Sequence, residues 1–126
     1  MKFQPDSLDG TNSITRFDTD AVWINGVAHR GSLLVPWRGE VQPWDATGLQ
    51  TLAPMHFEAV LGLRPELVIF GSGTRLQFVS PALYRALIDA RVGIETMDTG
   101  AAARTYNVLE AEGRTVVGAF LLEQSL

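Results

Sequence analysis

The segment ELVIFGSGT, residues 66–74, joins a continuous apolar run to a turn of glycine and serine. A strand that is apolar at successive positions, without polar alternation, is typical of a strand buried on both faces of a helix-covered sheet. We therefore expect residues 67–70 to form a central strand, with the glycine turn at its carboxyl end. The run is far shorter than the roughly 20 residues that cross a bilayer.

The first third of the chain is predicted to be rich in strands. Asn25-Gly26 lies between two β-prone runs, 21–24 and 27–29, which predicts a hairpin closed by a two-residue type I′ turn. A third apolar run ends near Pro36, because proline donates no ladder hydrogen bond. We expect this hairpin region to supply antiparallel partners for the central strand, and an irregular loop to follow at 37–50.

After residue 50 the pattern alternates between helix and strand. Ser80 before Pro81 is a helix N-cap with proline in the first turn, and Gly93 is a candidate C-terminal stop. The expected elements are an amphipathic helix at 51–63 with Pro54 in its first turn, a helix at 81–91, a strand at 93–97, a helix from Asp98 or Thr99 to Ala111 with Gly113 beyond it, and an apolar strand within 114–122.

This order of elements predicts one α/β domain over residues 1–126, with a central mixed sheet, helices and an N-terminal β-hairpin region. Ligands of such sheets bind beyond the carboxyl ends of the strands. The turn after Phe70 and the segment DTGAA after Met97 are both expected on that edge. A site, if the protein has one, is expected there.

The composition narrows the classes of function. With 14 acidic and 10 basic residues the net charge is −4, so the chain lacks the basic footprint that nucleic-acid binding needs. It has no cysteine, which excludes disulfides, thiolate metal sites and cysteine nucleophiles. The opening MKFQPDSLDG resembles neither a secretory signal nor a transit peptide, so we expect a cytoplasmic protein without a transmembrane segment.

The glycine turn matches no phosphate-binding or catalytic motif. A dinucleotide fingerprint would need a third glycine where Leu76 stands, and neither a Gly-Lys-Ser/Thr phosphate loop nor a Gly-x-Ser-x-Gly nucleophile elbow occurs. The turn is interpreted either as a corner that needs positive φ or as a nest for a small anion or metabolite. The hypothetical ligand-binding residues are Gly71, Ser72, Gly73, Thr74, Arg104 and Asn107, with Arg75 flanking the turn.

The remaining residue types indicate no catalytic or metal site. His29 and His56 have no ligand-spaced partner, the carboxylates are scattered, and we assign no catalytic residue, metal or cofactor. An enzyme activity is less expected than a binding function. Trp37 and Trp44 lie in a polar loop, where they either fold back over the sheet or form a surface that binds a protein partner.

The segment MDTGAAARTYNVLEAEGRTVVGAFLL, residues 97–122, carries a family resemblance. With the VIFGSGT turn, it resembles the small α/β domain family that includes mitochondrial complex I assembly factor 3, an adipogenesis-associated protein with an Mth-type domain, and many uncharacterised bacterial and archaeal proteins. The resemblance extends from NSITRFD and the WING hairpin to the last strand. The matching positions are Gly71, Gly73, Asp98, Thr99, Ala102, Tyr106, Asn107, Leu109, Glu112, Gly113 and Arg114.

This resemblance implies a three-layer fold and no established enzyme activity or cofactor. For the mitochondrial members it implies a role in building the respiratory NADH:ubiquinone oxidoreductase through protein contacts. Two hypotheses follow for this chain. The first is a non-enzymatic interaction module, an accessory factor for a membrane-associated complex, with an unidentified protein partner. The second is a small-ligand binder or weak enzyme that uses the glycine turn.

Overall fold

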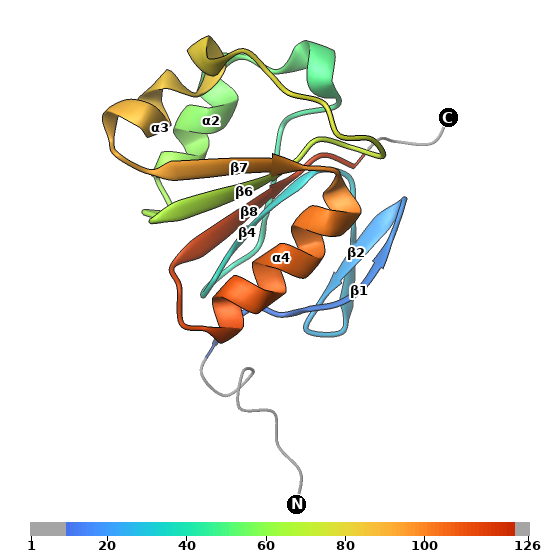
Figure 1. Ribbon diagram of the computed structural model, residues 1–126. Helices are drawn as coiled ribbons and strands as arrows, with labels where there is room; N and C mark the ends of the chain where they lie inside the picture. The colour runs from blue at the N-terminus through green and yellow to red at the C-terminus, as the bar shows by residue number, and fades with distance from the viewer. Residues whose placement is uncertain (1–9, 123–126) are drawn as a thin grey trace, which may run out of the picture.

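Two sheets, three α-helices and two 3-10 turns organise residues 10–122, the part of the chain that the computed structural model describes (Figure 1). The opening segment, in which we expect no targeting signal, lies almost wholly outside them. The smaller sheet is antiparallel, with the order β1-β2-β3, and consists of β1 at Ile14–Asp18, β2 at Ala21–Ile24 and β3 at Val27–Arg30. The larger sheet has the order β5-β4-β8-β6-β7, and consists of β5 at Gln42–Pro43, β4 at Leu33–Pro36, β8 at Val116–Phe120, β6 at Leu67–Gly71 and β7 at Gly93–Met97.

Strand β6 is the buried strand that the apolar run predicts. All five of its residues are buried, and it pairs in parallel with β7 on one side and β8 on the other. Val68 and Phe70 enter one hydrophobic core, whereas Leu67 and Ile69 enter a second core on the opposite face. The continuous apolar sequence therefore reflects two cores that share one strand.

The predicted hairpin exists, but its predicted role in the larger sheet is wrong. Asn25 and Gly26 have φ angles of 51° and 87°, both positive as a type I′ turn requires. The hairpin strands pair only with β1, while β4 supplies the antiparallel partner and pairs with β8. Both edges of β6 are filled by parallel strands, so the hairpin packs over the sheet instead of joining it.

The helices complete a layered arrangement (Figure 1). One layer holds the 3-10 turn η2 at Pro81–Tyr84 and the helices α2 at Pro54–Leu61 and α3 at Arg85–Asp89, which pack together and onto one core. A further 3-10 turn, η1, spans Leu49–Thr51. The other layer holds α4 at Thr99–Ala111, which packs on β6, β8 and β1 beside the smaller sheet. The three-layer fold and the central mixed sheet are confirmed.

The helix expected at 81–91 is shorter and interrupted. The Ser80 hydroxyl accepts a hydrogen bond from the Ala82 N–H at 3.3 Å, which confirms the cap, but the first turn is 3-10 and the α-helix ends at Asp89. The left-handed residue beyond it is Arg91, with φ 61°, whereas Gly93 begins β7 and is not the stop. Three residues, 90–92, then connect α3 to β7.

The last helix follows its prediction closely. Asp98 is its N-cap, and its carboxylate accepts a hydrogen bond from the Ala101 N–H at 2.9 Å. Gly113, just past the end, has φ 85°. Among the described helices, none has the length and apolar character that crossing a membrane takes.

Candidate functional site

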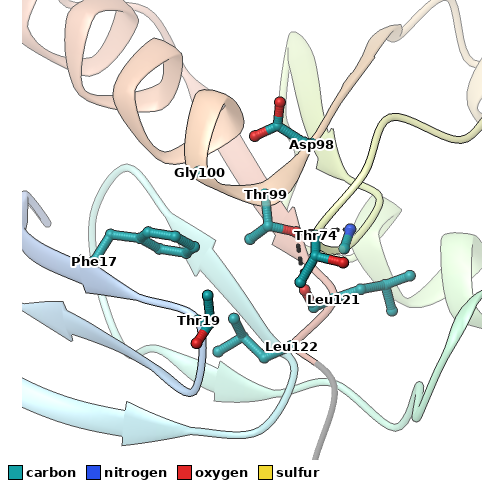
Figure 2. A pocket seen from close by; sticks show the side chains of 9 residues that line it. Phe17, Thr19, Thr74, Asp98, Thr99, Gly100, Leu121 and Leu122 are labelled. Carbon is teal, nitrogen blue, oxygen red and sulfur yellow. Dashed lines mark hydrogen bonds between the residues drawn. The ribbon is translucent and has the colours of Figure 1, made fainter.

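A pocket of about 120 Å³ lies at the carboxyl edge of the larger sheet, where the ends of β6, β7 and β8 meet (Figure 2). The glycine turn follows β6, the start of α4 follows β7, and the chain leaves β8 at Leu121. The tip of the β1–β2 hairpin covers this edge from the other side. The described residues that line the pocket are Phe17, Thr19, Gly73, Thr74, Asp98, Thr99, Gly100, Leu121 and Leu122.

Thr99, which follows β7, forms hydrogen bonds to the segments that follow β6 and β8. Its Oγ1 accepts a hydrogen bond from the Gly73 N–H at 2.9 Å and donates one to the Leu121 carbonyl at 2.9 Å. Its own N–H donates to the Gly73 carbonyl at 2.8 Å. A Cβ added at Gly71 would lie 2.9 Å from the Thr99 Cα and 2.8 Å from its Oγ1. Glycine at position 71 therefore permits the close approach of helix α4 to strand β6.

The glycine turn is built mainly from internal hydrogen bonds. The Ser72 N–H donates to the Met97 carbonyl at 2.8 Å, and the Gly73 N–H is bound to Thr99 as described. The Ser72 hydroxyl accepts from the Gln77 N–H at 3.0 Å and lies 2.8 Å from the Arg75 carbonyl. Two of the turn's amides are thus committed inside the protein, and the hypothesis of an anion nest at residues 71–74 stays a prediction.

The pocket brings together apolar walls and a single charged side chain among its described lining residues. Figure 2 shows Phe17, Thr19 and Leu122 around the cavity and Asp98 at its rim. The Asp98 carboxylate is already the N-cap of α4. Within residues 10–122, no cluster of three histidine, cysteine, aspartate or glutamate residues is placed to hold a metal ion.

Arg104 and Asn107 lie in a neighbouring groove, not in this pocket. That groove has a volume of about 130 Å³ and runs between β1 and α4, with Phe17 lining both cavities. The Asn107 carboxamide accepts from the Ile14 N–H at 2.8 Å and donates to the Ile14 carbonyl at 2.7 Å. Asn107 thus makes the two hydrogen bonds that a neighbouring strand residue would make to β1. The structure therefore separates the six hypothetical ligand-binding residues into two places.

The two loop tryptophans occupy different environments. Trp44 is 5 % exposed, its indole N–H donates to the His56 carbonyl at 3.0 Å, and its ring meets Phe57 and Phe70 edge to face. Trp37 is half-buried and packs against both cores. Trp44 therefore presents little surface to a partner, and the hypothesis that the tryptophans form an interaction surface rests on Trp37.

Tyr106 ties the N-terminal segment to the sheet beneath α4. Its hydroxyl lies 2.9 Å from the Asn12 carbonyl and 3.0 Å from the Pro36 carbonyl. Burial raises the pKa of Tyr106 above its ordinary value, and the nearby Glu110 carboxylate acts in the same direction. The hydroxyl stays protonated and acts as a structural donor.

The sequence did not single out four lining residues, Phe17, Thr19, Leu121 and Leu122. Phe17 and Thr19 reach the edge only because the smaller sheet folds over α4, which local patterns do not reveal. The leucines had a usable signal, because they follow the apolar run of the last strand and β8 is parallel to β6. Its end therefore lies on the same edge as the glycine turn.

Residues 14–121 match a family model described as a protein of unknown function, DUF498/DUF598. An uncharacterized protein of Rhodobacter capsulatus is 37 % identical over 98 residues, which are 78 % of this chain and 74 % of that protein. The NADH dehydrogenase [ubiquinone] 1 alpha subcomplex assembly factor 3 of Bos taurus is 33 % identical over 84 residues, which are 65 % of this chain. The aligned part is 45 % of the bovine protein, less than half of its length.

A solved structure has the same fold. The crystal structure of a protein from Bordetella parapertussis has a TM-score of 0.86 and 34 % identity, and the match covers 90 % of this chain and 98 % of that one. The similarity therefore extends over most of both chains.

Proposed function

Because the chain belongs to the DUF498/DUF598 family of proteins of unknown function, we propose that it is a non-enzymatic protein-interaction domain that serves as an accessory or assembly factor for a membrane-associated respiratory complex. The observation that carries this proposal is the 33 % identity to the bovine NADH dehydrogenase assembly factor. The proposal extends to a cytoplasmic location. The partner contact would be made at the carboxyl edge of the sheet and at Trp37.

The carboxyl edge supports a binding role through its chemistry. Its walls are the Phe17 ring, the Leu122 side chain and threonine side chains, and its carboxylate is held as a helix cap. Apolar, preformed cavities with few polar groups suit recognition of a partner group. No pair of groups that could exchange a proton with a substrate converges among the described lining residues.

The alternative of a small-anion or metabolite-binding protein remains a prediction. It would use the Thr74 end of the glycine turn, because the Ser72 and Gly73 amides already donate within the protein. Thermal stabilisation by a metabolite, lost in Gly73→Val, would favour it. Saturation at 100 times Kd adds about 2.7 kcal/mol to the free energy of unfolding, which a melting scan detects.

The proposed function is tested by depleting the protein in its native cells. We expect depletion to reduce the amount of assembled NADH:ubiquinone oxidoreductase on native gels and the matching activity of isolated membranes. Crosslinking of the tagged protein, with membrane and soluble fractions analysed separately, is expected to capture a subunit of that complex.

Re-expression separates a specific effect from general stress. The wild-type chain should restore assembly, and so should Phe78→Ala, which truncates a 75 % exposed side chain outside the pocket. Normal assembly in depleted cells, at normal growth, would rule the assembly role out.

A further inference from the structure

We propose that the pocket at the carboxyl edge binds an aliphatic side chain that neighbours a lysine or arginine in a segment of the partner protein. The inference rests on the proposed interaction function, because it names the chemistry of the partner that this surface accepts. It follows from the size of the cavity, the nature of its walls and the charges on its rim.

The size and apolar walls of the cavity suit a small aliphatic group. Its volume is about 120 Å³, and apolar cavities of about 150 Å³ are known to take up benzene. Phe17, which is 36 % exposed, and Leu122 form apolar walls, whereas the Leu121 side chain points away from them into the core on the opposite face of the sheet. Covering this exposed ring and filling the cavity removes apolar surface from water, which favours binding.

Asp98 is the charged side chain among the described residues that line the cavity. Asp18 and Asp20 flank lining residue Thr19 in the chain, and Arg75 follows lining residue Thr74. None of these three carboxylates forms an ion pair within residues 10–122. The Asp18 carboxylate accepts a hydrogen bond from the Thr19 N–H at 2.7 Å, which fixes the hairpin tip beside the pocket. The chain as a whole carries a net charge of −4, so the long-range field also favours a cationic partner.

An anionic partner group finds few donors at this place. The Thr99 N–H donates to the Gly73 carbonyl, the Ala101 N–H to the Asp98 carboxylate, and the Gly73 N–H to Thr99 Oγ1. These three amides are thus committed within the protein, although a glycine turn or a helix start alone would be a familiar anion site. The Asp98 carboxylate, which forms no ion pair within residues 10–122, then favours a cationic group at the rim.

The test uses three capped hexapeptides and the backbone amide NMR signals of the full chain. One peptide alternates lysine with leucine, the second glutamate with leucine, and the third lysine with serine. We expect only the first to shift the signals of Gly73, Gly100 and Leu122 in a saturable way, at millimolar concentration or below. Shifts caused equally by the second or third peptide, or none from the first, would overturn the inference.

Two pairs of variants locate the contact. Asp98→Asn keeps a capping oxygen and removes the charge, so it should weaken binding of the lysine–leucine peptide about two- to five-fold. Asp89→Asn on α3 should leave this affinity unchanged. Phe17→Ala should abolish saturation, whereas Phe78→Ala should preserve it. Equal effects within either pair would contradict the proposed position of the peptide.

Three further outcomes are informative. If Leu126→Ser alone shifts the pocket signals of the free protein, the chain's own end is the occupant and the inference is wrong. If no peptide binds while depletion still impairs complex assembly, only the pocket chemistry fails. If the lysine–leucine peptide binds as expected while assembly is normal without the protein, the pocket inference stands and the assembly role fails.

Discussion

Replacement of Asn107 by alanine tests whether its carboxamide stabilises the edge strand β1 through hydrogen bonds to the backbone. The Asn107 carboxamide pairs with both the N–H and the carbonyl of Ile14, at 2.8 and 2.7 Å. Ile14 is 8 % exposed, so water replaces these bonds poorly. At about 1 kcal/mol net for each hydrogen bond, the variant should lose about 2 kcal/mol of unfolding free energy.

This loss corresponds to a measurable change in melting temperature. The unfolding entropy of a 126-residue chain is about 0.26 kcal/mol/K, at roughly 2.1 cal/mol/K per residue, so Asn107→Ala should melt about 8 °C lower. Urea unfolding followed by circular dichroism measures the free energy directly. Arg104→Ala is the matched control on the same helix, because Arg104 is exposed, and it should change stability by less than about 0.5 kcal/mol.

Asn107→Asp adds an internal check on the geometry. The carboxylate can still accept from the Ile14 N–H, but it faces the Ile14 carbonyl, so the variant should be at least as unstable as Asn107→Ala at neutral pH. Protonation in mild acid restores a donor and should recover part of the stability difference. An Asn107→Ala protein that unfolds within about 0.5 kcal/mol of wild type would refute the idea that this carboxamide holds β1 on α4.

Three further substitutions test the packing around the two cores. Gly71→Ala should cost about 1–3 kcal/mol in urea unfolding, because its Cβ would meet the backbone of Thr99 at 2.9 Å; a neutral result would contradict the close approach. Trp44→Ala should cost about 3–5 kcal/mol and half-buried Trp37→Ala less, so equal losses would contradict the burial difference. Tyr106→Phe should be less stable than wild type by about 1 kcal/mol at neutral pH. Because the raised pKa of Tyr106 gives stability that is present below the ordinary value of 10.0 and lost as pH rises beyond it, this difference should shrink in alkaline unfolding series; a constant gap would count against burial of the hydroxyl.

Local signals determined much of the fold in this chain. Asn25-Gly26 predicts its turn because both φ angles must be positive, and Asp98 predicts the start of α4 because its carboxylate caps a free N–H. These signals act over a few residues, so the sequence displays them directly. The predicted end of the helix at 81–91 was wrong, although its N-cap was correct. The capping signal is local, whereas the early end at Asp89 depends on the return of the chain to β7.

The candidate site depended on both levels. The sequence placed the glycine turn and the DTGAA segment at one edge of the sheet, because parallel strands bring their carboxyl ends together. It did not show that Thr99 accepts a hydrogen bond from the Gly73 N–H, or that Asn107 forms hydrogen bonds with β1 and does not line the pocket. Hydrogen-bond partners separated by 26 or 93 residues have no sequence signal in a single chain.

The sequence by itself determined that residues 67–70 form a doubly buried strand within an α/β domain, because a strand between two cores must be apolar on both faces. Only the tertiary structure decided that β1 and the predicted hairpin form a separate sheet, that the turn between β1 and β2 lies at the carboxyl edge with Phe17 beside it, and that an apolar pocket with Asp98 at its rim results. The physical reason is that periodicity reports which face of an element is buried, whereas the element that covers this face is chosen by packing between distant segments.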